Sequence, residues 1–427
     1  MKHPILPLLE KRSKFFCPAK WTELYLYLNH GLSNSCHHPI PHEIPQELLG
    51  NPSVLHNTPH KLKQQELMLA GQRPKECHMC WHVEDSNPDA WSDRYVKSNL
   101  WKNYIDTLQV DPEFVPPFIE VVFDNVCNLA CSYCDSGQSS RWATLIKKQP
   151  LELKTDYRNL YNRVHIDPGS TKDQYYEAWQ RWWPSIRKKV QTIKVSGGEP
   201  LLSKNFWSFL SSLDAAPQMN FDINSNLMAD IKQLKRLAKH AAKFRIMTIA
   251  ASIDGQGAIA EFTRQGLDTE TFIKNAKWWC EHTPANAVIN FQSTVNIFSV
   301  WSLTSALDLT LELRDIYGPK VQEHYVTIVR FPEFQSVLLM PKELRIMLHK
   351  EITEWQTKNH HRLTANEFNY ITKVSGYLIS DPVPLETLEE KDLKQDLLKF
   401  VQFYTQTGSI SLDVFPEKFV NWIQCVT

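Results

Sequence analysis

The sequence contains no run of about 18 apolar residues, which is the length that a membrane-spanning helix requires. It carries no net charge, because 47 Lys and Arg residues balance 47 Asp and Glu residues, so no global charge indicates a polyanionic partner. It also lacks internal repeats, low-complexity tracts and a small-residue cleavage site, and we interpret residues 1–16 as mature protein. These absences predict a cytoplasmic protein without membrane contact, and they make nucleic acid an unexpected partner.

Cysteine is the residue type that needs an explanation, since nine cysteines occur in a sequence expected to stay in the cytosol. Thiols remain reduced there, so clustered cysteines more often bind metal or perform chemistry than form disulfides. Seven of the nine fall into two groups, namely Cys127, Cys131 and Cys134, and Cys17, Cys36, Cys77 and Cys80. Cys280 and Cys425 stand alone, and we expect them to be structural or incidental.

A chain of 427 residues exceeds one ordinary hydrophobic core, and its composition and periodicity change twice. Residues 1–105 are rich in Pro, His and Asn and look irregular, apart from a helix predicted from Pro59 to Gly71. Residues 115–335 alternate between strand and helix patterns, and residues 336–427 look mostly helical. We therefore predict three domains with these boundaries.

The strand pattern of the central region indicates an α/β fold. Its predicted strands are 118–124, 192–197, 221–226, 245–254, 287–296 and 325–331. Helical stretches lie between them, which favours a parallel sheet with right-handed crossovers. Six β/α units favour a partial barrel, although periodicity alone does not separate it from a doubly wound sheet. Residues 135–175 form a long insertion with a loop-like stretch at 165–173, and loops of this length are usually functional or mobile.

The segment DNVCNLACSYCDSG follows the first predicted strand and holds Cys127, Cys131 and Cys134 in a CxxxCxxC spacing. Three thiolates bind three irons of a [4Fe–4S] cubane and leave the fourth iron open to another ligand, much as catalytic zinc sites keep an open position. A structural zinc loop is the alternative for this spacing.

CNLACSYC, with Tyr133 before the third cysteine, resembles the signature of the radical S-adenosylmethionine (SAM) superfamily. The segment SGGEPLL at 196–202 resembles the GGEP motif of the same family, whose backbone and glutamate hold the amino group of SAM. Gly197 and Gly198 permit close backbone approach, and Glu199 supplies an anionic acceptor for an ammonium group. Taken alone, the motif is also compatible with an ordinary Gly-Gly turn and an exposed glutamate.

Further polar residues follow the later predicted strands in an order that the resemblance explains. Asn226 ends INSN, Ser252 and Asp254 belong to SIDG, and Arg264 lies in EFTRQG. The resemblance implies a SAM ribose contact for Ser252 and a SAM carboxylate contact for Arg264. Taken alone, Ser, Asp and Asn at strand ends are usually turn formers. All lie at or just beyond the C-terminal ends of strands, where barrel active sites gather.

The resemblance covers roughly residues 115–335 and implies a partial (β/α)6, TIM-like barrel of the radical SAM type. It implies that a [4Fe–4S] cluster cleaves SAM reductively to a 5′-deoxyadenosyl radical. It further implies that an electron donor such as flavodoxin or ferredoxin is a partner.

The N-terminal cysteines occur as CPAKW, NSCHHP and CHMCW, and four thiolates can complete a tetrahedral site. This region resembles the twitch or SPASM type of auxiliary-cluster domain, here before the barrel rather than after it. The resemblance extends to Trp81, Glu84, Ser92 and Arg94 and implies a second [4Fe–4S] cluster. Zinc is the alternative, because four thiolates suit both metals.

His37, His38 and His78 are possible additional ligands of that site, or else histidines of surface loops. Residues 1–105 look too irregular to be held by their own core. We therefore expect a metal-stapled domain, in which metal binding contributes folding free energy.

The expected function is hydrogen abstraction from a ribosomally made peptide or protein, because twitch and SPASM domains commonly accompany such maturases. Modification of a sugar or nucleotide is an alternative. Modification of tRNA is another, supported only by a basic stripe that is more often a solvated helix face: Lys232, Lys235, Arg236, Lys239, Lys243 and Arg245. A non-enzymatic, metal-stapled scaffold is the remaining alternative.

Overall fold

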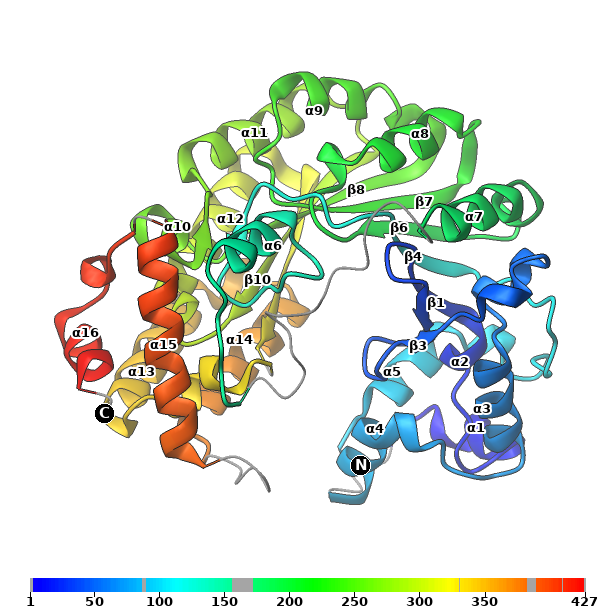
Figure 1. Cartoon of the computed structure of the whole chain (residues 1–427), viewed down its shortest axis with the longest axis horizontal. Helices are drawn as coiled ribbons and strands as arrows, with labels where there is room; N and C mark the ends of the chain where they lie inside the picture. The colour runs from blue at the N-terminus through cyan, green and yellow to red at the C-terminus, as the bar shows by residue number, and fades with distance from the viewer. Residues whose placement is uncertain are drawn as a thin grey trace. The chain divides into compact units, whose positions relative to one another are not determined.

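Strands and helices alternate along much of the chain, and the computed structural model has the α/β architecture that the sequence predicts (Figure 1). It describes residues 3–86, 90–155, 172–329, 331–381, 389–408 and 410–425, without the side chains of residues 172 and 173. The loop predicted at 165–173 therefore lies largely outside the described residues. No helix of the described ranges has the length and apolar character that crossing a membrane requires.

Nine strands form one sheet, in the order β11-β10-β8-β7-β6-β4-β1-β2-β3. They are β1 (Glu23–Tyr27), β2 (Leu32–Asn34), β3 (His42–Glu43), β4 (Phe118–Val122), β6 (Thr192–Ser196), β7 (Ala216–Ser225), β8 (Phe244–Ser252), β10 (Ala287–Val295) and β11 (Val321–Ile328). All six predicted strands are present. A separate small sheet pairs β5 (Ala130–Cys131) with β9 (Arg264–Gln265).

The large sheet is mostly parallel. β1 pairs in parallel with β4 and β4 with β6, and β8 pairs in parallel with β10 and β10 with β11. β2 is antiparallel to both β1 and β3. Across the described ranges no pairing joins the two ends of this order, so the sheet is open, and the predicted partial TIM-like barrel is not confirmed.

The chain divides into two compact units. The first unit comprises Met1–Asp124, Ile166–Ser196 and Gln218–Phe221. The second unit comprises Asn125–His165, Gly197–Pro217 and Asp222–Thr427.

The first unit is more regular than the sequence predicts. Its helices are α1 (Leu6–Arg12), α2 (Ala19–Thr22), α3 (Pro59–Leu69), α4 (His78–Ser86), α5 (Asp93–Leu100) and α7 (Lys172–Ile186). The Thr58 hydroxyl caps α3 by accepting from the Lys61 amide, and Pro59 occupies the first helical position. Gly71 follows the helix with φ 70°, a conformation that favours glycine.

This unit also has a hydrophobic core of its own, which corrects the expectation of an irregular segment. Phe16, Trp21 and Met68 are fully buried and pack with Trp81 and Tyr95. These residues come from separate short elements, so no periodic pattern of apolar residues in the sequence predicts that they form a core. The fold of residues 1–105 therefore does not depend on a metal for all of its core.

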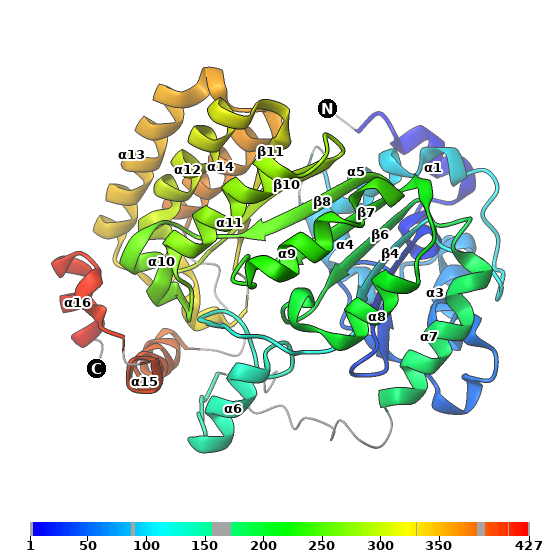
Figure 2. The same ribbon diagram turned by 90° about the horizontal axis from the view of Figure 1, so that it is seen from above.

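The helices of the second unit cover its strands and extend to the C-terminus. They are α6 (Ser140–Lys148), α8 (Lys204–Ser212), α9 (Ile231–Ala238), α10 (Gly257–Thr263), α11 (Thr269–His282), α12 (Leu303–Tyr317), α13 (Lys342–Asn359), α14 (Ala365–Ile379), α15 (Glu390–Gly408) and α16 (Glu417–Gln424). α9 lies beside α11, and α14 packs on both α13 and β11 (Figure 2). The sequence analysis missed α6, which lies inside the predicted insertion.

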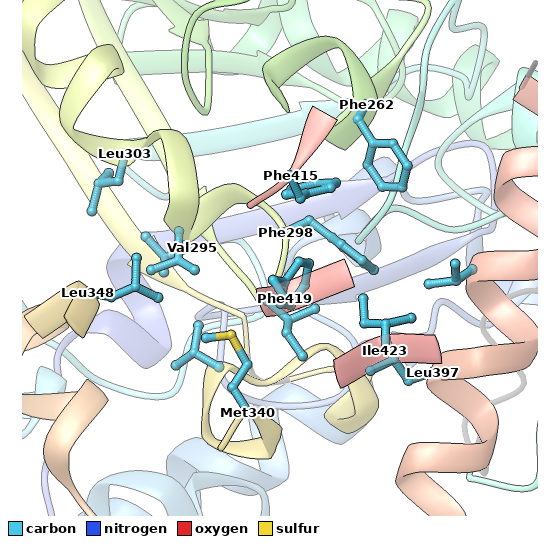
Figure 3. Close-up of a cluster of buried hydrophobic side chains, with 14 of the residues drawn as sticks. Phe262, Val295, Phe298, Leu303, Met340, Leu348, Leu397, Phe415, Phe419 and Ile423 are labelled. Atoms are coloured by element: carbon cyan, nitrogen blue, oxygen red, sulfur yellow. The ribbon is translucent and has the colours of Figure 1, made fainter. Parts of the chain in front are cut away.

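The C-terminal helices share one core with the segments around the first cysteine group. Figure 3 shows Phe262, Phe298, Phe415 and Phe419 packed together, and the Phe262 and Phe415 ring centroids are 4.9 Å apart. The same cluster includes Trp142 and Tyr404 and has Cys134 packed against it. The residues after 336 therefore help to build the surroundings of the cysteine loop.

Candidate functional site

Cys127, Cys131 and Cys134 lie on the loop that follows β4 in the chain. None of the described cysteines forms a disulfide, and Cys131 is buried while the other two are half-buried. Burial raises the pKa of the Cys134 thiol, and the neighbouring Cys131 and Cys127 raise it further. Burial and Cys131 raise the pKa of Cys127 to about 12. Burial and the neighbouring thiols therefore both disfavour ionisation of Cys127 and Cys134 unless a nearby positive charge compensates.

Distant segments of the second unit hold the backbone at Cys131. The Trp142 indole donates to the Cys131 carbonyl (2.8 Å), and the Tyr404 hydroxyl donates to the Ala130 carbonyl (2.6 Å). On the other side, β5 pairs with β9, and the Ser132 amide donates to the Thr263 carbonyl (2.8 Å). The backbone around the middle cysteine is thus fixed by contacts from α6, α10 and α15.

The Gly-Gly-Glu segment contacts the residue that precedes Cys127. The Glu199 amide donates to the Val126 carbonyl (2.7 Å). A Cβ atom on Gly198 would lie 2.3 Å from the same carbonyl oxygen, so no other residue fits there without a shift. Gly197 has φ 121°, which again favours glycine. The two sequence motifs, predicted separately, therefore meet in the structure.

The Glu199 carboxylate is buried and accepts three hydrogen bonds from within the chain. Its donors are the Leu201 amide (3.1 Å), the Ser225 hydroxyl (2.9 Å) and the Asn226 amide (2.7 Å). Burial raises the pKa of Glu199 to about 7, while these donors act in the opposite direction. Glu199 thereby holds the end of β7 against the Gly-Gly turn.

Asn226 and Ser252 lie at strand ends, as predicted, and both have side-chain partners. The Asn226 side-chain amide donates to the Asn128 side-chain carbonyl (2.8 Å), which belongs to the cysteine loop. The Ser252 hydroxyl is half-buried and accepts from the Gln292 side chain (2.7 Å). Asn226 thus links β7 to the loop, and Ser252 remains partly open.

Tyr133, Asp254 and Arg264 form one buried network. The Tyr133 hydroxyl (2.7 Å) and the Arg264 Nε (2.8 Å) both donate to Asp254 Oδ2, and the Thr294 amide donates to Oδ1 (2.8 Å). Arg264 Nη1 lies 3.7 Å from the Cys131 sulfur. Burial raises the pKa of Cys131, and Arg264 opposes that rise. The guanidinium therefore favours a thiolate at the middle cysteine.

The four N-terminal cysteines line a single pocket in the first unit. Cys17, Cys36, Cys77 and Cys80 all belong to its lining, together with Lys20, Arg94 and Lys97. In the described ranges no three cysteine sulfurs lie within 4.8 Å of one another. Tetrahedral zinc with Zn–S bonds of about 2.3 Å requires sulfurs roughly 3.8 Å apart. The thiols are thus spread more widely than one zinc ion needs, and a cubane, which binds each thiolate at a separate corner, fits better.

The residues of the Trp-Glu-Ser-Arg resemblance assemble beside this pocket. Arg94 Nη2 pairs with Glu84 Oε2 (2.6 Å), and the Ser92 hydroxyl donates to Glu84 Oε1 (2.6 Å). Arg94 also donates to the carbonyl of Phe16, which precedes Cys17, and lies over the Trp81 ring. Together they connect α4 and α5 to the first cysteine of the group.

Sequence reasoning missed two lysines that line the same pocket, the buried Lys20 and the half-buried Lys97. Lys20 forms an ion pair with Glu76, and Lys97 forms one with Glu23. Lys20, Lys97 and Arg94 each oppose the effect of burial on the pKa of one of the four thiols. The sequence did offer one signal for a cation near these thiols, because Lys20 follows Cys17 by three residues within CPAKW.

The predicted additional histidines separate in the structure. His38 lines the pocket, and both His37 (3.0 Å) and His38 (2.7 Å) contact Asp93 Oδ2. His78 is exposed at the start of α4 and does not line the pocket.

The basic stripe that could indicate tRNA binding lies partly on α9. Its residues Lys232, Lys235 and Lys239 are exposed, as on a solvated helix face, and Arg236 stacks on Trp207.

No protein-family model matches the sequence, and no curated protein matches it either. The relation of the two cysteine groups to the radical SAM family therefore stays a prediction.

Proposed function

We propose that the chain is a radical SAM enzyme built on the partial barrel of that family. The observation that carries this proposal is the contact between the two motifs: three free thiols lie on one loop, and the Gly-Gly-Glu segment hydrogen-bonds to the residue before the first of them. In this proposal Cys127, Cys131 and Cys134 hold a [4Fe–4S] cluster with one open iron. A bound cluster of this kind supplies the electron that breaks a C–S bond of SAM.

The donor set fits such a cluster. All three thiols are free, share one environment and are spaced more widely than a single zinc ion requires. Burying thiolates is costly without a nearby positive charge, and Arg264 supplies one at Cys131. The Asp254 carboxylate keeps that guanidinium in position, because it accepts from Arg264 Nε.

The remaining residues of the site bind and orient in this proposal. Ser252 accepts one hydrogen bond from Gln292 and still has its proton to donate, so it can contact a ribose oxygen of SAM. Gly198 lets the turn approach the Val126 carbonyl closely, and Gly197 takes the positive φ of that turn, so the two glycines set the backbone path beside the cysteine loop. The Glu199 carboxylate can accept more hydrogen bonds than the three that it receives from within the chain. It can therefore also accept a hydrogen bond from the ammonium group of SAM.

We further propose that Cys17, Cys36, Cys77 and Cys80 hold an auxiliary [4Fe–4S] cluster. Their wide spacing supports iron–sulfur over zinc, and the three cations around them suit the negative charge of either site. With such a cluster, a peptide or protein is the proposed substrate, and a small electron-transfer protein is the proposed reductant.

Production of 5′-deoxyadenosine by anaerobically purified protein tests the proposal. Replacing Cys127, Cys131 and Cys134 together by Ala should abolish that product and remove about four of the roughly eight irons per chain. Cys280→Ala is the matched control, because Cys280 is buried on α11 outside both groups, and it should retain activity and iron. Full product formation by the triple variant would refute the proposal. About four irons and one zinc in the wild type would refute the auxiliary cluster alone.

A further inference from the structure

Two histidines and a glutamate form a separate cluster of potential metal ligands in the first unit. His42 belongs to β3, His60 lies in the first turn of α3, and Glu76 lies in the short turn Lys75–Cys77. One ligand atom from each of the three residues falls within 4.8 Å of the other two. The His42 and His60 ring centroids are 4.4 Å apart, and His60 Nε2 lies 2.7 Å from Glu76 Oε2. Three different elements thus converge on one point.

Each of two ligands is fixed by a second residue. His42 Nε2 lies 2.7 Å from the Thr58 hydroxyl, and Thr58 is itself held as the cap of α3. The buried Lys20 pairs with Glu76 Oε1, which leaves Oε2 directed to His60. Partners that orient the ligands in this way are typical of built metal sites, where they fix the ring and the carboxylate.

The form of the histidines also suits coordination. Burial lowers the pKa of His42 to about 3, so its imidazole is neutral and keeps a lone pair at physiological pH. The side chain of His60 is 44% exposed, which leaves the cluster accessible from solvent. A neutral imidazole, an accessible imidazole and a carboxylate are ligands that divalent transition metals accept.

The other histidine cluster of this unit, His37, His38 and Asp93, is built differently. Both imidazoles contact the same carboxylate oxygen, Asp93 Oδ2, so a histidine–aspartate ion pair accounts for the arrangement. The side chains of His37 and Asp93 are 52% and 41% exposed, and His38 already belongs to the cysteine pocket. This cluster therefore serves as an internal control.

We propose that His42, His60 and Glu76 form a binding site for one divalent transition-metal ion, distinct from both cysteine groups. Two nitrogens and one oxygen leave open positions for water or another ligand, as in zinc or non-haem iron sites with two histidines and one carboxylate. In the metal-free arrangement His60 Nε2 and Glu76 Oε2 are in hydrogen-bond contact, and a bound ion would replace that contact. The proposal does not depend on what the cysteines bind.

Titration with Co²⁺ tests the site, because the visible spectrum of the ion reports its ligands. The full-length protein would be used without a histidine tag and with both cysteine groups left as purified. We expect one Co²⁺ per chain with nitrogen–oxygen bands and no thiolate-to-metal charge-transfer band. His60→Ala should weaken binding by at least about tenfold. The matched control His37→Ala should bind as the wild type does.

Several results would overturn the proposal. Equal affinity in His60→Ala and wild type would do so, as would absence of binding or an equal loss in His37→Ala. A thiolate charge-transfer band on the bound Co²⁺ would assign the ion to cysteine instead. Because the His60 side chain is 44% exposed and does not belong to the buried core, its replacement should leave the iron content and the melting temperature unchanged. A loss of iron or a lower melting temperature in His60→Ala would make the cluster structural and would also count against the site.

Discussion

Replacing Tyr404 by Phe removes a single hydroxyl from the support of the cysteine loop. That hydroxyl donates to the Ala130 carbonyl (2.6 Å) and accepts from the Gln265 amide (3.2 Å), and the residue is completely buried. The ring stacks with Trp142 and Phe400, and Phe preserves that packing. The substitution therefore changes hydrogen bonding next to Cys131 with little change in apolar contact.

The expected cost follows from the groups left behind. Leaving a buried donor or acceptor unsatisfied costs about 1–3 kcal/mol. If this energy is lost mainly by the closed state of the loop, local opening becomes roughly 5- to 150-fold more frequent. Iron bound by Cys127, Cys131 and Cys134 should then leave faster by the same factor. Global unfolding should change less, because the aromatic core stays packed.

A chelator that forms a coloured iron complex measures this rate in anaerobically purified protein. Tyr377→Phe on α14 is the matched control, because its hydroxyl lies 3.3 Å from the Ser336 hydroxyl and no hydrogen bond among the described residues joins it to the cysteine loop. The rate of iron release should rise in Tyr404→Phe and stay unchanged in Tyr377→Phe. Release at the wild-type rate in both variants would refute the argument that α15 holds the loop closed.

Two further substitutions test the Gly-Gly-Glu segment. Glu199→Gln removes a carboxyl whose pKa rises on folding from 4.5 to about 7, so wild-type stability present at low pH is lost between these values. Denaturant unfolding at pH 5 and pH 8 should show the wild type losing about 3 kcal/mol relative to the variant, and a constant difference would contradict the burial effect. Gly198→Ala should abolish SAM binding and lower the melting temperature, because its Cβ would meet a backbone carbonyl at 2.3 Å. Gly376→Ala on α14, where a Cβ meets nothing within 4 Å, should raise the melting temperature slightly, and similar behaviour of the two alanine variants would contradict the close approach.

The strands and the cysteine loop could be predicted because their signals are local. In the stretches 118–124 and 287–296, apolar residues either alternate with polar ones or follow one another within a single element. Both stretches form strands. The N-terminal core could not be predicted in this way, since Phe16, Trp21 and Met68 come from different short elements. These residues are buried because separate elements pack together, and a periodic apolar pattern within one element does not indicate such packing.

The supporting residues of the candidate site were missed for the same reason. Tyr404 and Ala130 are 274 positions apart, and nothing in the sequence around either residue indicates the other. Glu199 was predicted from its motif, but its bonds to Ser225 and Asn226 depend on how β7 ends beside the Gly-Gly turn. A motif thus identifies a residue type at a position, whereas its partners follow only from the fold.

Buried or half-buried cations lie at both cysteine groups, and one electrostatic requirement explains them. Thiolates in a buried site lose hydration, so nearby positive charge is needed to keep them ionised. Arg264 supplies it at Cys131, and Lys20, Arg94 and Lys97 supply it around the N-terminal pocket. Each of these cations is paired with a carboxylate, which prevents an uncompensated buried charge when the thiols are protonated. The same arrangement at two separate groups of cysteines supports the proposal that both groups carry negative charge, as metal-bound thiolates do.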